Sequence, residues 1–389
     1  MQIVKQRGLC RTMYCVACLV LAMLPAEAGA QAKVKITVLP LKVVGTQVQN
    51  SKKQRVRLRG VNAASLEWSS NGEGHILETV KRAVEDWHCN IVRIPVTQDR
   101  WFGKAPEQTD EGAAYRDLVK QVIDYCAANG CYVMIDNHWS DEGEWGKQIG
   151  QHLMPEENSV VFWKDFAMLY KNHPAVLFDL YNEPHDTTWD IWLNGGQVTE
   201  RDRRTRTEKT YTAVGMQALL DAVRSTGAKN VVVAGGLDWA YDMSGFLNGK
   251  ALVDKKGNGV IYANHNYPFK GDTFEKWLAK MELASKTLPI IVSEFGAGGG
   301  GPPSRNALPS DVWVRRVLQA LHDHEWDFCA WDLHPSAGPT LISDWNYTPT
   351  PYFGVYVKQE LAGTLQPYTP PAPGTASPDQ RPTNTAPPR

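Results

Sequence analysis

Two glutamates, Glu183 and Glu294, each stand at the end of a short apolar segment of the chain. A carboxylic acid can donate a proton while a second carboxylate attacks or stabilises a positive charge, so such a pair can split a bond held between them. Pro184 follows the first glutamate and ends its strand, because proline has no N–H for the hydrogen-bond ladder. A carboxylate and the amide of Asn182 at the end of a buried strand must be hydrogen-bonded, paired or used in chemistry.

Polar and aromatic side chains also end several other apolar segments. The residues at these ends are Arg93, His138, Asn182, His265, Tyr267 and Trp331. Each of them alone has a structural explanation, such as a salt bridge for Arg93 or packing for Trp331. Together with Glu183 and Glu294 they occupy the ends of six of the eight segments, which predicts one shared site.

Eight apolar segments alternate with amphipathic ones. The apolar segments are 56–62, 89–96, 131–138, 175–183, 230–236, 259–267, 288–296 and 328–333. Such runs of Val, Ile and Leu are typical of strands that are buried on both faces, as in parallel sheets. Helical spacing is found near 75–87, 117–130, 157–172, 207–226, 272–286 and 310–323. The alternation predicts an α/β fold, a (β/α)8 TIM barrel, in preference to an open doubly wound sheet.

Other features agree with a barrel. No G-x-G-x-x-G follows the first strand, which argues against a dinucleotide-binding fold. Residues 34–57 alternate like an N-terminal β-hairpin, and we expect this hairpin to cap the bottom of the barrel. Because chemistry in such barrels takes place at the carboxyl ends of the strands, we expect Glu183 and Glu294 to face each other across the mouth. Two carboxyl groups that face each other across a narrow barrel mouth are what hydrolysis of a glycosidic bond requires.

Seven short segments resemble, in order, the signature segments of glycoside hydrolase family 5, the large cellulase-containing family of retaining barrel enzymes. They are RGVN (59–62), VRIPV (92–96), IDNHW (135–139), LYNEPH (180–185), NHNYP (264–268), VSEFG (292–296) and AWDL (330–333). The resemblance covers roughly residues 35–362. It departs from the family pattern at Asn137, where many members carry an aromatic residue, and we expect this change to affect subsite preference and not the reaction.

The resemblance implies roles for individual residues. Glu183 matches the acid/base of the family and Glu294 its nucleophile. Arg93 and Tyr267 would orient the nucleophile, and three residues would line the −1 subsite, namely His138, Asn182 and His265. Trp331 can form the floor under a sugar ring. We expect further sugar-stacking platforms among Trp139, Trp239, Trp68 and Trp345.

These features predict a secreted retaining β-glycosidase that hydrolyses β-1,4-linked glucan, an endo-β-1,4-glucanase or cellulase. The same chemistry on β-mannan or xyloglucan, or an exo-acting β-glucosidase, remains an alternative. The loops 138–158 and 185–204 are expected to wall the cleft and to decide between these substrates. A non-catalytic carbohydrate-binding barrel is disfavoured because both glutamates and their expected supports are intact.

The two ends of the chain differ from the middle. Residues 1–30 have the order of a secretory signal peptide: basic residues, the apolar stretch 13–24, and small residues around Ala28. That stretch is shorter than the roughly 20 residues that a spanning helix needs. We therefore expect a catalytic domain at 31–366 that is secreted to the periplasm or outside the cell, with no membrane span after signal cleavage. Residues 367–389 are rich in Pro, Thr and Ala and predict a disordered tail.

The charge balance bears on which molecules the protein binds, and the cysteines bear on disulfides and metal binding. With 41 basic and 42 acidic residues, the sequence favours no nucleic-acid partner, and we expect a monomer that binds a polysaccharide or oligosaccharide. Four cysteines lie beyond the signal: Cys89, Cys126, Cys131 and Cys329. They allow three disulfide pairings, or they are reduced core side chains. None of these four cysteines forms a C-x2-C pair with another, so we predict neither a metal nor a cofactor.

Overall fold

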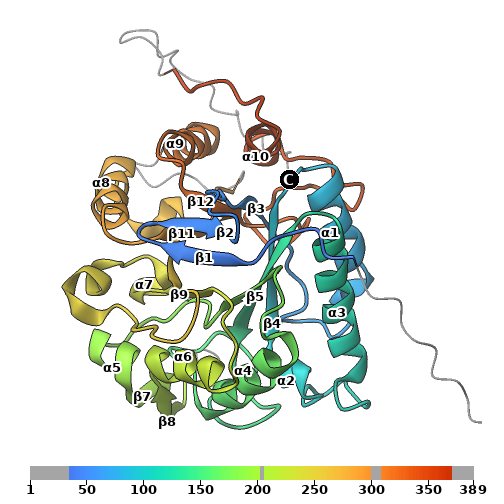
Figure 1. Cartoon of the computed structure of the whole chain (residues 1–389), viewed down its shortest axis with the longest axis vertical. Helices are drawn as coiled ribbons and strands as arrows, with labels where there is room; N and C mark the ends of the chain where they lie inside the picture. The colour runs from blue at the N-terminus through green and yellow to red at the C-terminus, as the bar shows by residue number, and fades with distance from the viewer. Residues whose placement is uncertain (1–34, 202–205, 299–307, 370–389) are drawn as a thin grey trace, which may run out of the picture. The chain divides into compact units, whose positions relative to one another are not determined.

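A computed structural model describes residues 35–201, 206–298 and 308–369 of the 389-residue chain. At its centre is a closed barrel of parallel strands (Figure 1). In order around the barrel, the strands are β3 (Arg59–Asn62), β4 (Ile91–Thr97), β5 (Tyr132–Trp139), β6 (Val176–Asp179), β9 (Val232–Gly235), β10 (Val260–Asn266), β11 (Ile290–Phe295) and β12 (Asp327–Ala330). The barrel prediction is confirmed, and each of the eight predicted segments overlaps one of these strands.

Helices surround the barrel and lie between consecutive strands (Figure 1). They are α1 (Ile76–Glu85), α2 (Gln98–Trp101), α3 (Ala113–Ala128), α4 (Glu157–Tyr170), α5 (Trp189–Asn194), α6 (Met216–Ser225), α7 (Leu237–Ala240), α8 (Phe274–Ser285), α9 (Ser310–Asp323) and α10 (Gly354–Leu361). Three short turns of other helical types are η1 (Gly72–Gly74), η2 (Phe246–Lys250) and η3 (Pro268–Lys270). The main helices pack through one apolar stripe, as in α1, where Ile76, Val80 and Ala83 are buried at helical spacing.

The amino-terminal hairpin closes one end of the barrel. It consists of β1 (Leu41–Val44) and β2 (Gln47–Asn50), which pair in an antiparallel register. Leu41 and Val48 from this hairpin pack with side chains near the starts of the barrel strands, among them Ile91 and Val231. This end of the barrel is therefore filled with apolar side chains, as predicted, and polar chemistry is left to the opposite end of the strands.

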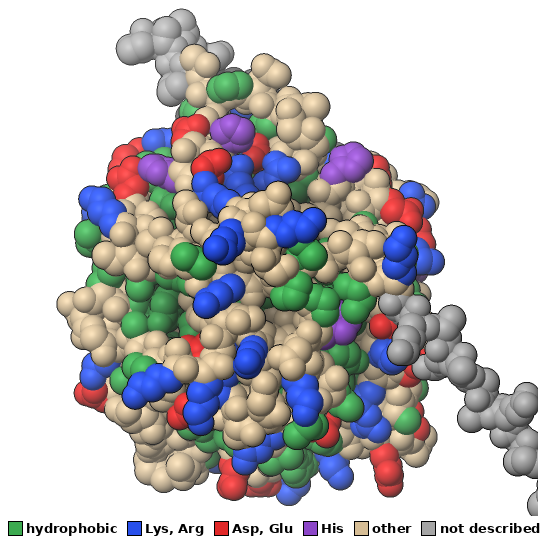
Figure 2. Space-filling model, viewed as in Figure 1, with side chains coloured by type: hydrophobic (Ala, Val, Ile, Leu, Met, Phe, Trp, Pro, Cys, Tyr) green, Lys and Arg blue, Asp and Glu red, His purple; other side chains and the backbone are tan. Residues whose placement is uncertain are grey.

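Figure 2 shows the face of the molecule that carries this hairpin. Lys and Arg side chains are spread over that face between acidic, apolar and uncharged ones, and they do not gather into a single tract. A dispersed distribution of charge on this face offers no electrostatic footprint for a polyanion.

One region differs from the sequence prediction. Residues 207–226 were predicted to be helical, but the first part forms the strand β8 (Glu208–Val214), paired with β7 (Gly195–Arg201) in a second hairpin. Buried Tyr211 and Ala213 alternate with exposed Thr210 and Thr212, which is the period of a strand and not of a helix. The helix α6 begins only after Gly215. Thus the predicted loop 185–204 contains α5 and β7, and its residues 202–205 lie outside the described part.

The four cysteines of the described part are buried and free: Cys89, Cys126, Cys131 and Cys329. They match the alternative in which cysteines act as small core side chains. None of the helices in the described ranges is long and apolar enough to cross a bilayer.

The two predicted end segments lie mostly outside the described residues. The whole of 1–30 lies outside them, and of 367–389 only residues 367–369 are described. Within the predicted tail, Tyr368 contacts α9, because its N–H donates to Gln319 Oε1 at 3.2 Å and its ring lies 5.1 Å from the Arg315 guanidinium carbon. Ordered contacts to the barrel domain therefore extend at least to this residue.

Candidate active site

Glu183 and Glu294 come together at the carboxyl ends of the barrel strands. Glu294 lies in β11, and Glu183 lies in the turn that follows β6. One carboxyl oxygen of each lies within 4.8 Å of the other and of a ring nitrogen of His265. Both glutamates line a cavity of about 600 Å³. The remaining lining residues are His138, Asn182, Asp238, Trp239, Tyr267, Phe269, Lys270, Trp331, Gly338 and Pro339.

Each oxygen of the Glu294 carboxyl group accepts one strong hydrogen bond. Arg93 Nη1 donates to Oε1 at 2.7 Å, and Tyr267 Oη donates to Oε2 at 2.7 Å. Two short hydrogen bonds, one from a guanidinium and one from a phenol, fix the orientation of the carboxyl group. The Glu294 carboxyl group is therefore held in one orientation in the wall of the cavity.

Arg93 is fully buried and lies at the centre of a polar network. Besides Glu294, it contacts Asp179 through Nε at 2.9 Å and Asp136 through Nη2 at 3.0 Å. Burial alone lowers the pKa of Arg93, but these three carboxylates outweigh it and raise the pKa well above its usual value. Asn182 Oδ1 also accepts a hydrogen bond from Nη2 at 2.8 Å, so Arg93 fixes both a glutamate and an amide of the site.

Glu183 has a different environment. Its side chain is 18% exposed, and Oε1 lies 2.9 Å from His265 Nδ1. Burial raises the pKa of Glu183, whereas the positive charges of Lys270 and Arg93 oppose that shift. Burial also lowers the pKa of His265 to about 3, so this imidazole is neutral at ordinary pH. Glu183 therefore keeps its proton to a higher pH than an ordinary glutamate, which suits a general acid.

His138 and Asn182 form a polar edge of the cavity. His138 Nδ1 lies 2.6 Å from Asp136 Oδ2, and burial lowers the pKa of His138 to about 4. The neutral ring therefore donates through Nδ1 to the carboxylate and leaves Nε2 as an acceptor, which faces the Asn182 Nδ2 amide at 3.4 Å. Both side chains present fixed hydrogen-bonding groups to any ligand in the cavity.

Aromatic rings supply the apolar part of the wall. Trp331 stacks on His138 with a centroid distance of 5.4 Å and an interplanar angle of 13°. Trp239 stacks on His185 at 4.4 Å. Its backbone is strained, because Asp238, Trp239 and Ala240 have φ angles of 54°, 54° and 56° in the left-handed region. Strain of this kind at a cavity wall is typical of functional positions.

The predicted site residues fall into three groups. The cavity is lined by Glu183, Glu294, His138, Asn182, Tyr267, Trp331 and Trp239. Arg93 and His265 lie behind this wall, fully buried, and contact the glutamates. Trp139 is outside the lining, with its ring centroid 6.5 Å from that of His138. Of the weaker candidates, Trp68 packs with Tyr267 and Trp331, and Trp345 stacks on His75.

Sequence reasoning missed several residues that line the cavity. They are Asp238, Phe269, Lys270, Gly338 and Pro339. Phe269 and Lys270 follow Tyr267 closely in the sequence. Because the segment after a barrel strand begins at the same rim as the end of that strand, the position of Tyr267 indicated that these two residues lie near the cavity. Phe269 is 76% exposed and stacks on Tyr267, with 5.2 Å between ring centroids. An exposed aromatic residue at the cavity rim is available to a ligand.

The trio of Glu183, His265 and Glu294 also has the spacing of a metal site. However, both Glu294 oxygens already accept hydrogen bonds from Arg93 and Tyr267. Arg93 adds a positive charge beside any ion that would bind there. The arrangement thus fits two cooperating carboxyl groups better than a cation site.

Comparison with known proteins agrees with this geometry. Residues 49–337 match the family model described as Cellulase (glycosyl hydrolase family 5), so the chain belongs to that family. Endoglucanase MaCel5A from Microbulbifer sp. (strain ALW1) is 25% identical over 268 residues, which cover 66% of this chain and 44% of that protein. Endoglucanase Z from Dickeya dadantii is 25% identical over 291 residues, which cover 72% and 57%. The chain thus spans about half the length of these relatives.

Solved structures share the fold. The β-glucanase SdGluc5_26A from Saccharophagus degradans, in complex with cellotetraose, has a TM-score of 0.66 at 20% identity and covers 87% of this chain and 98% of its own. The catalytic domain of Thermobifida fusca endoglucanase Cel5A has a TM-score of 0.58 at 17% identity and covers 83% and 97%. At these identities the similarity establishes a common barrel fold.

Proposed function

We propose that this protein hydrolyses β-1,4-linked glucan with retention of configuration, using Glu183 and Glu294. The separation of the two carboxyl groups carries the proposal, since one oxygen of each lies within 4.8 Å of the other. Retaining enzymes place the carboxyl groups about 5–5.5 Å apart, whereas inverting enzymes need about 6.5–9.5 Å to admit a water molecule. The short separation supports direct attack by one of the carboxylates.

In the first step, a Glu294 oxygen attacks the anomeric carbon while Glu183 gives its proton to the departing glycosidic oxygen. The carbon–oxygen bond to the leaving sugar breaks, and a covalent glycosyl ester on Glu294 forms. In the second step, ionised Glu183 removes a proton from water, the water oxygen attacks the same carbon, and Glu294 leaves as a carboxylate. Together the two steps restore both carboxyl groups of the enzyme, and water is the only reactant besides the glycan.

The surrounding residues support these roles. Arg93 and Tyr267 orient the Glu294 carboxylate for attack, because they bind one oxygen each. His138 and Asn182 offer hydrogen bonds to sugar hydroxyls, and Trp331 offers a flat apolar face to a sugar ring. Polar groups between aromatic faces suit a pyranose, which has hydroxyls at its edge and apolar C–H faces.

The choice of β-1,4-glucan rests on the relatives. Two of them are named endoglucanases, and one solved β-glucanase of the same fold was crystallised with cellotetraose. On this basis we propose the glucan backbone and endo action for this chain. We also propose that residues 1–30 direct export, which amino-terminal sequencing of protein recovered outside the cytoplasm would test by locating the cleavage site.

The test measures reducing ends and viscosity with carboxymethyl-cellulose, barley β-glucan, xyloglucan and galactomannan. We expect a rapid fall in viscosity on a β-1,4-containing glucan, because cleavage within the chain shortens it quickly. Glu294→Gln should abolish turnover while the fold remains intact, as judged by circular dichroism. Product release only from chain ends, or activity confined to galactomannan, would contradict the proposed substrate. Wild-type activity in Glu294→Gln would contradict the mechanism.

A further inference from the structure

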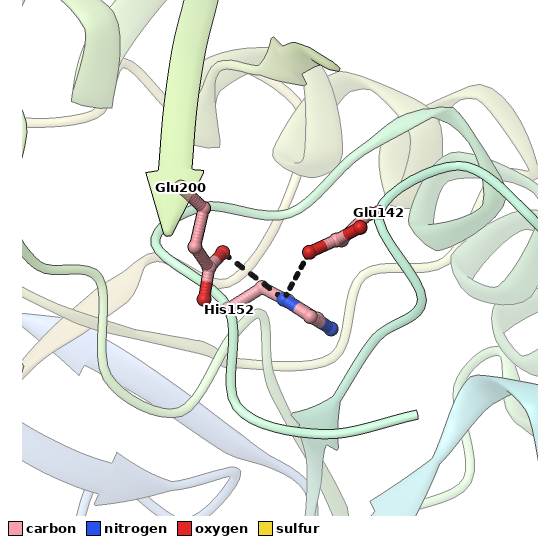
Figure 3. A group of neighbouring side chains, drawn as sticks. All are labelled: Glu142, His152 and Glu200. Carbon is pink, nitrogen blue, oxygen red and sulfur yellow. Dashed lines mark hydrogen bonds and ion pairs between the residues drawn. The ribbon is translucent and has the colours of Figure 1, made fainter. Parts of the chain in front are cut away.

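A second cluster of titratable side chains lies beside the active site. Glu142, His152 and Glu200 point toward one another in the wall of a separate cavity of about 480 Å³ (Figure 3). His152 Nδ1 lies 3.0 Å from Glu200 Oε2 and 3.4 Å from Glu142 Oε1. Trp239 lines this cavity and the active-site cavity, so the two are neighbours.

The cluster joins two parts of the chain that are distant in sequence. Glu142 and His152 belong to the loop between β5 and α4, and Glu200 belongs to β7 of the second hairpin. His152 is 6% exposed and Glu142 is 9% exposed. The side chain of Glu200 is 18% exposed. The three ligand-type atoms are thus largely removed from bulk water, where unpaired carboxylates are costly.

The hydrogen bonding of His152 leaves a place for a cation. Its Nε2 lies 2.5 Å from the carbonyl oxygen of Gln148. A carbonyl can only accept, so Nε2 carries a hydrogen. In the neutral imidazole, Nδ1 then has a lone pair that faces two carboxylate oxygens. Three acceptors that converge in this way require a proton or a cation between them, which is a second proton on the ring, a proton on one carboxyl group or a metal ion.

The neighbouring charges leave the cluster negative when His152 is neutral. Lys209 Nζ lies 3.1 Å from Glu142 Oε2, but it also lies 3.0 Å from Glu144 Oε1. Lys209 therefore divides its single charge between two carboxylates on the outer side. Arg201 lines the cavity near Glu200. The Leu153 N–H donates weakly to Glu200 Oε2 at 3.4 Å, and this bond adds no charge.

The spacing of the three atoms matches a tetrahedral metal site. Ligand atoms about 2.1 Å from a tetrahedral ion are about 3.4 Å apart. The observed separations from His152 Nδ1 are 3.0 and 3.4 Å, and all three atoms lie within 4.8 Å of one another. An ion can therefore enter with small movements of the side chains. The bond from Nε2 to the Gln148 carbonyl is the outer contact that metal-bound histidines typically make.

We propose that Glu142 Oε1, His152 Nδ1 and Glu200 Oε2 bind one divalent transition-metal ion, with zinc favoured by the one-nitrogen, two-oxygen donor set. The adjoining cavity leaves the fourth position to water. This site differs from the catalytic pair, since it contains neither Glu183 nor Glu294. It was not predicted because its ligands are widely spaced and match no sequence motif.

The metal would hold in place the loop between β5 and α4, which contacts the active site. Gln151 precedes His152, and its Nε2 donates to the Glu183 carbonyl oxygen at 3.1 Å. Its Oε1 accepts from Asn182 Nδ2 at 2.9 Å. By joining this loop to β7, the ion would hold Gln151 against the strand end that carries Asn182 and Glu183. The expected role is structural, with no part in bond cleavage.

The experiment uses the full chain without an affinity tag, stripped with a chelator and titrated with zinc chloride at pH 7.5 by calorimetry. We expect about one zinc ion per chain. Zinc at about 100 times its dissociation constant should raise the melting temperature by several degrees. Binding should weaken at pH 5.5, because protons compete with the metal for His152 Nδ1.

Variants assign the site. His152→Gln and Glu200→Gln should each lose zinc binding and the rise in melting temperature. Glu144→Gln is the matched control, because it removes a neighbouring carboxylate that touches Lys209 but is no ligand. Glu294→Gln should also retain the ion, which separates this site from the catalytic pair. This last control distinguishes a failure of the metal proposal from a failure of the proposed function.

Two outcomes would overturn the proposal. One is a wild-type chain that takes up no zinc at pH 7.5, and the other is undiminished uptake by folded His152→Gln. In the first case His152 is held as an imidazolium, in agreement with the pKa of His152, which is raised because the carboxylates and the Gln148 carbonyl outweigh the effect of burial. His152→Gln would then be less stable than wild type in chelator at low pH.

Discussion

Arg93 and Tyr267 divide the two oxygens of Glu294 between them, and this single contact pair distinguishes Glu294 from Glu183. Glu183 has a neutral histidine as its closest partner and lies where burial raises its pKa. Two carboxyl groups of the same type thus have different hydrogen-bond partners and different surroundings. At the scale of the residue, the site is defined by which donors reach which oxygen.

Tyr267→Phe removes the hydroxyl that donates a hydrogen bond to Glu294 and keeps the aromatic ring. We expect kcat/KM to fall by about 10- to 100-fold, because a hydrogen bond to a charged group contributes about 1.5–3 kcal/mol. The melting temperature should change little. Tyr241→Phe serves as the control, since it loses a comparable bond to Asp272, at 2.9 Å, away from the glutamates. Equal losses in both variants would refute an orienting role for Tyr267.

The alkaline limb of the pH–rate profile should report Glu183. In the proposed mechanism Glu183 acts in its protonated form, so the rate is expected to fall as pH rises through its raised pKa. The positive charge of Lys270 favours the ionised form of Glu183 and lowers that pKa. Lys270→Met should therefore move the alkaline limb to higher pH. Lys255→Met, an exposed lysine on another loop, should leave the profile unchanged, and an unshifted limb in Lys270→Met would contradict the assignment.

At the scale of the element, close strand packing decides where the side chains arrive. Gly60 in β3 pairs with Ile91 in β4, and two residues further along the same register Asn62 lies opposite Arg93. Asn62 Oδ1 accepts from Arg93 Nη1 at 3.0 Å, and its own amide donates to the Ser293 carbonyl at 2.9 Å. The register of the first two barrel strands thus places the network that holds Glu294.

Gly60→Ala should be strongly destabilising. A Cβ at this position would lie 1.7 Å from the Ile91 carbonyl oxygen, which is main chain and cannot rotate away. We expect a loss of about 3 kcal/mol or more in the free energy of unfolding, measured by chemical denaturation. Gly298→Ala is the control, because a Cβ there meets nothing within 4 Å. Similar stabilities for the two variants would show that β3 and β4 are not packed so closely.

At the scale of the whole molecule, buried carboxyl groups couple stability to pH. Burial raises the pKa of Glu67 to about 8 and that of Asp327 to about 7. Between the unfolded pKa near 4 and these folded values, the native state binds more protons than the unfolded state. The free energy of unfolding therefore decreases with pH: the stability that these groups contribute is lost as pH rises from about 4 to about 8.

Glu67→Gln isolates one of these groups. Oε2 of Glu67 accepts from the Ser65 N–H at 2.8 Å, a bond that a glutamine oxygen can keep, and Oε1 has no partner among the described residues. We expect the variant to match wild type near pH 5 and to be more stable than wild type at pH 9. Thermal unfolding at both pH values measures this. A constant difference between the two proteins across this range would rule out a buried neutral Glu67.

The sequence by itself determined the barrel and the glutamate pair, because both follow from local pattern. Strands of a barrel are short apolar runs, and their carboxyl ends meet at one rim, so residue order alone places Glu183 near Glu294. The same reasoning failed for 208–214, where a strand continues into the helix α6 through one glycine and the change of period is easily missed.

Only the tertiary structure decided what surrounds the pair. Arg93 meets Glu294 across 201 residues, and His152 meets Glu200 across 48. Contacts of this kind depend on strand register and on how loops pack, and they leave no periodic signal in the chain. For that reason the divided bonding of Glu294, the Phe269 and Lys270 rim, and the three-residue cluster beside the active site emerged from the fold.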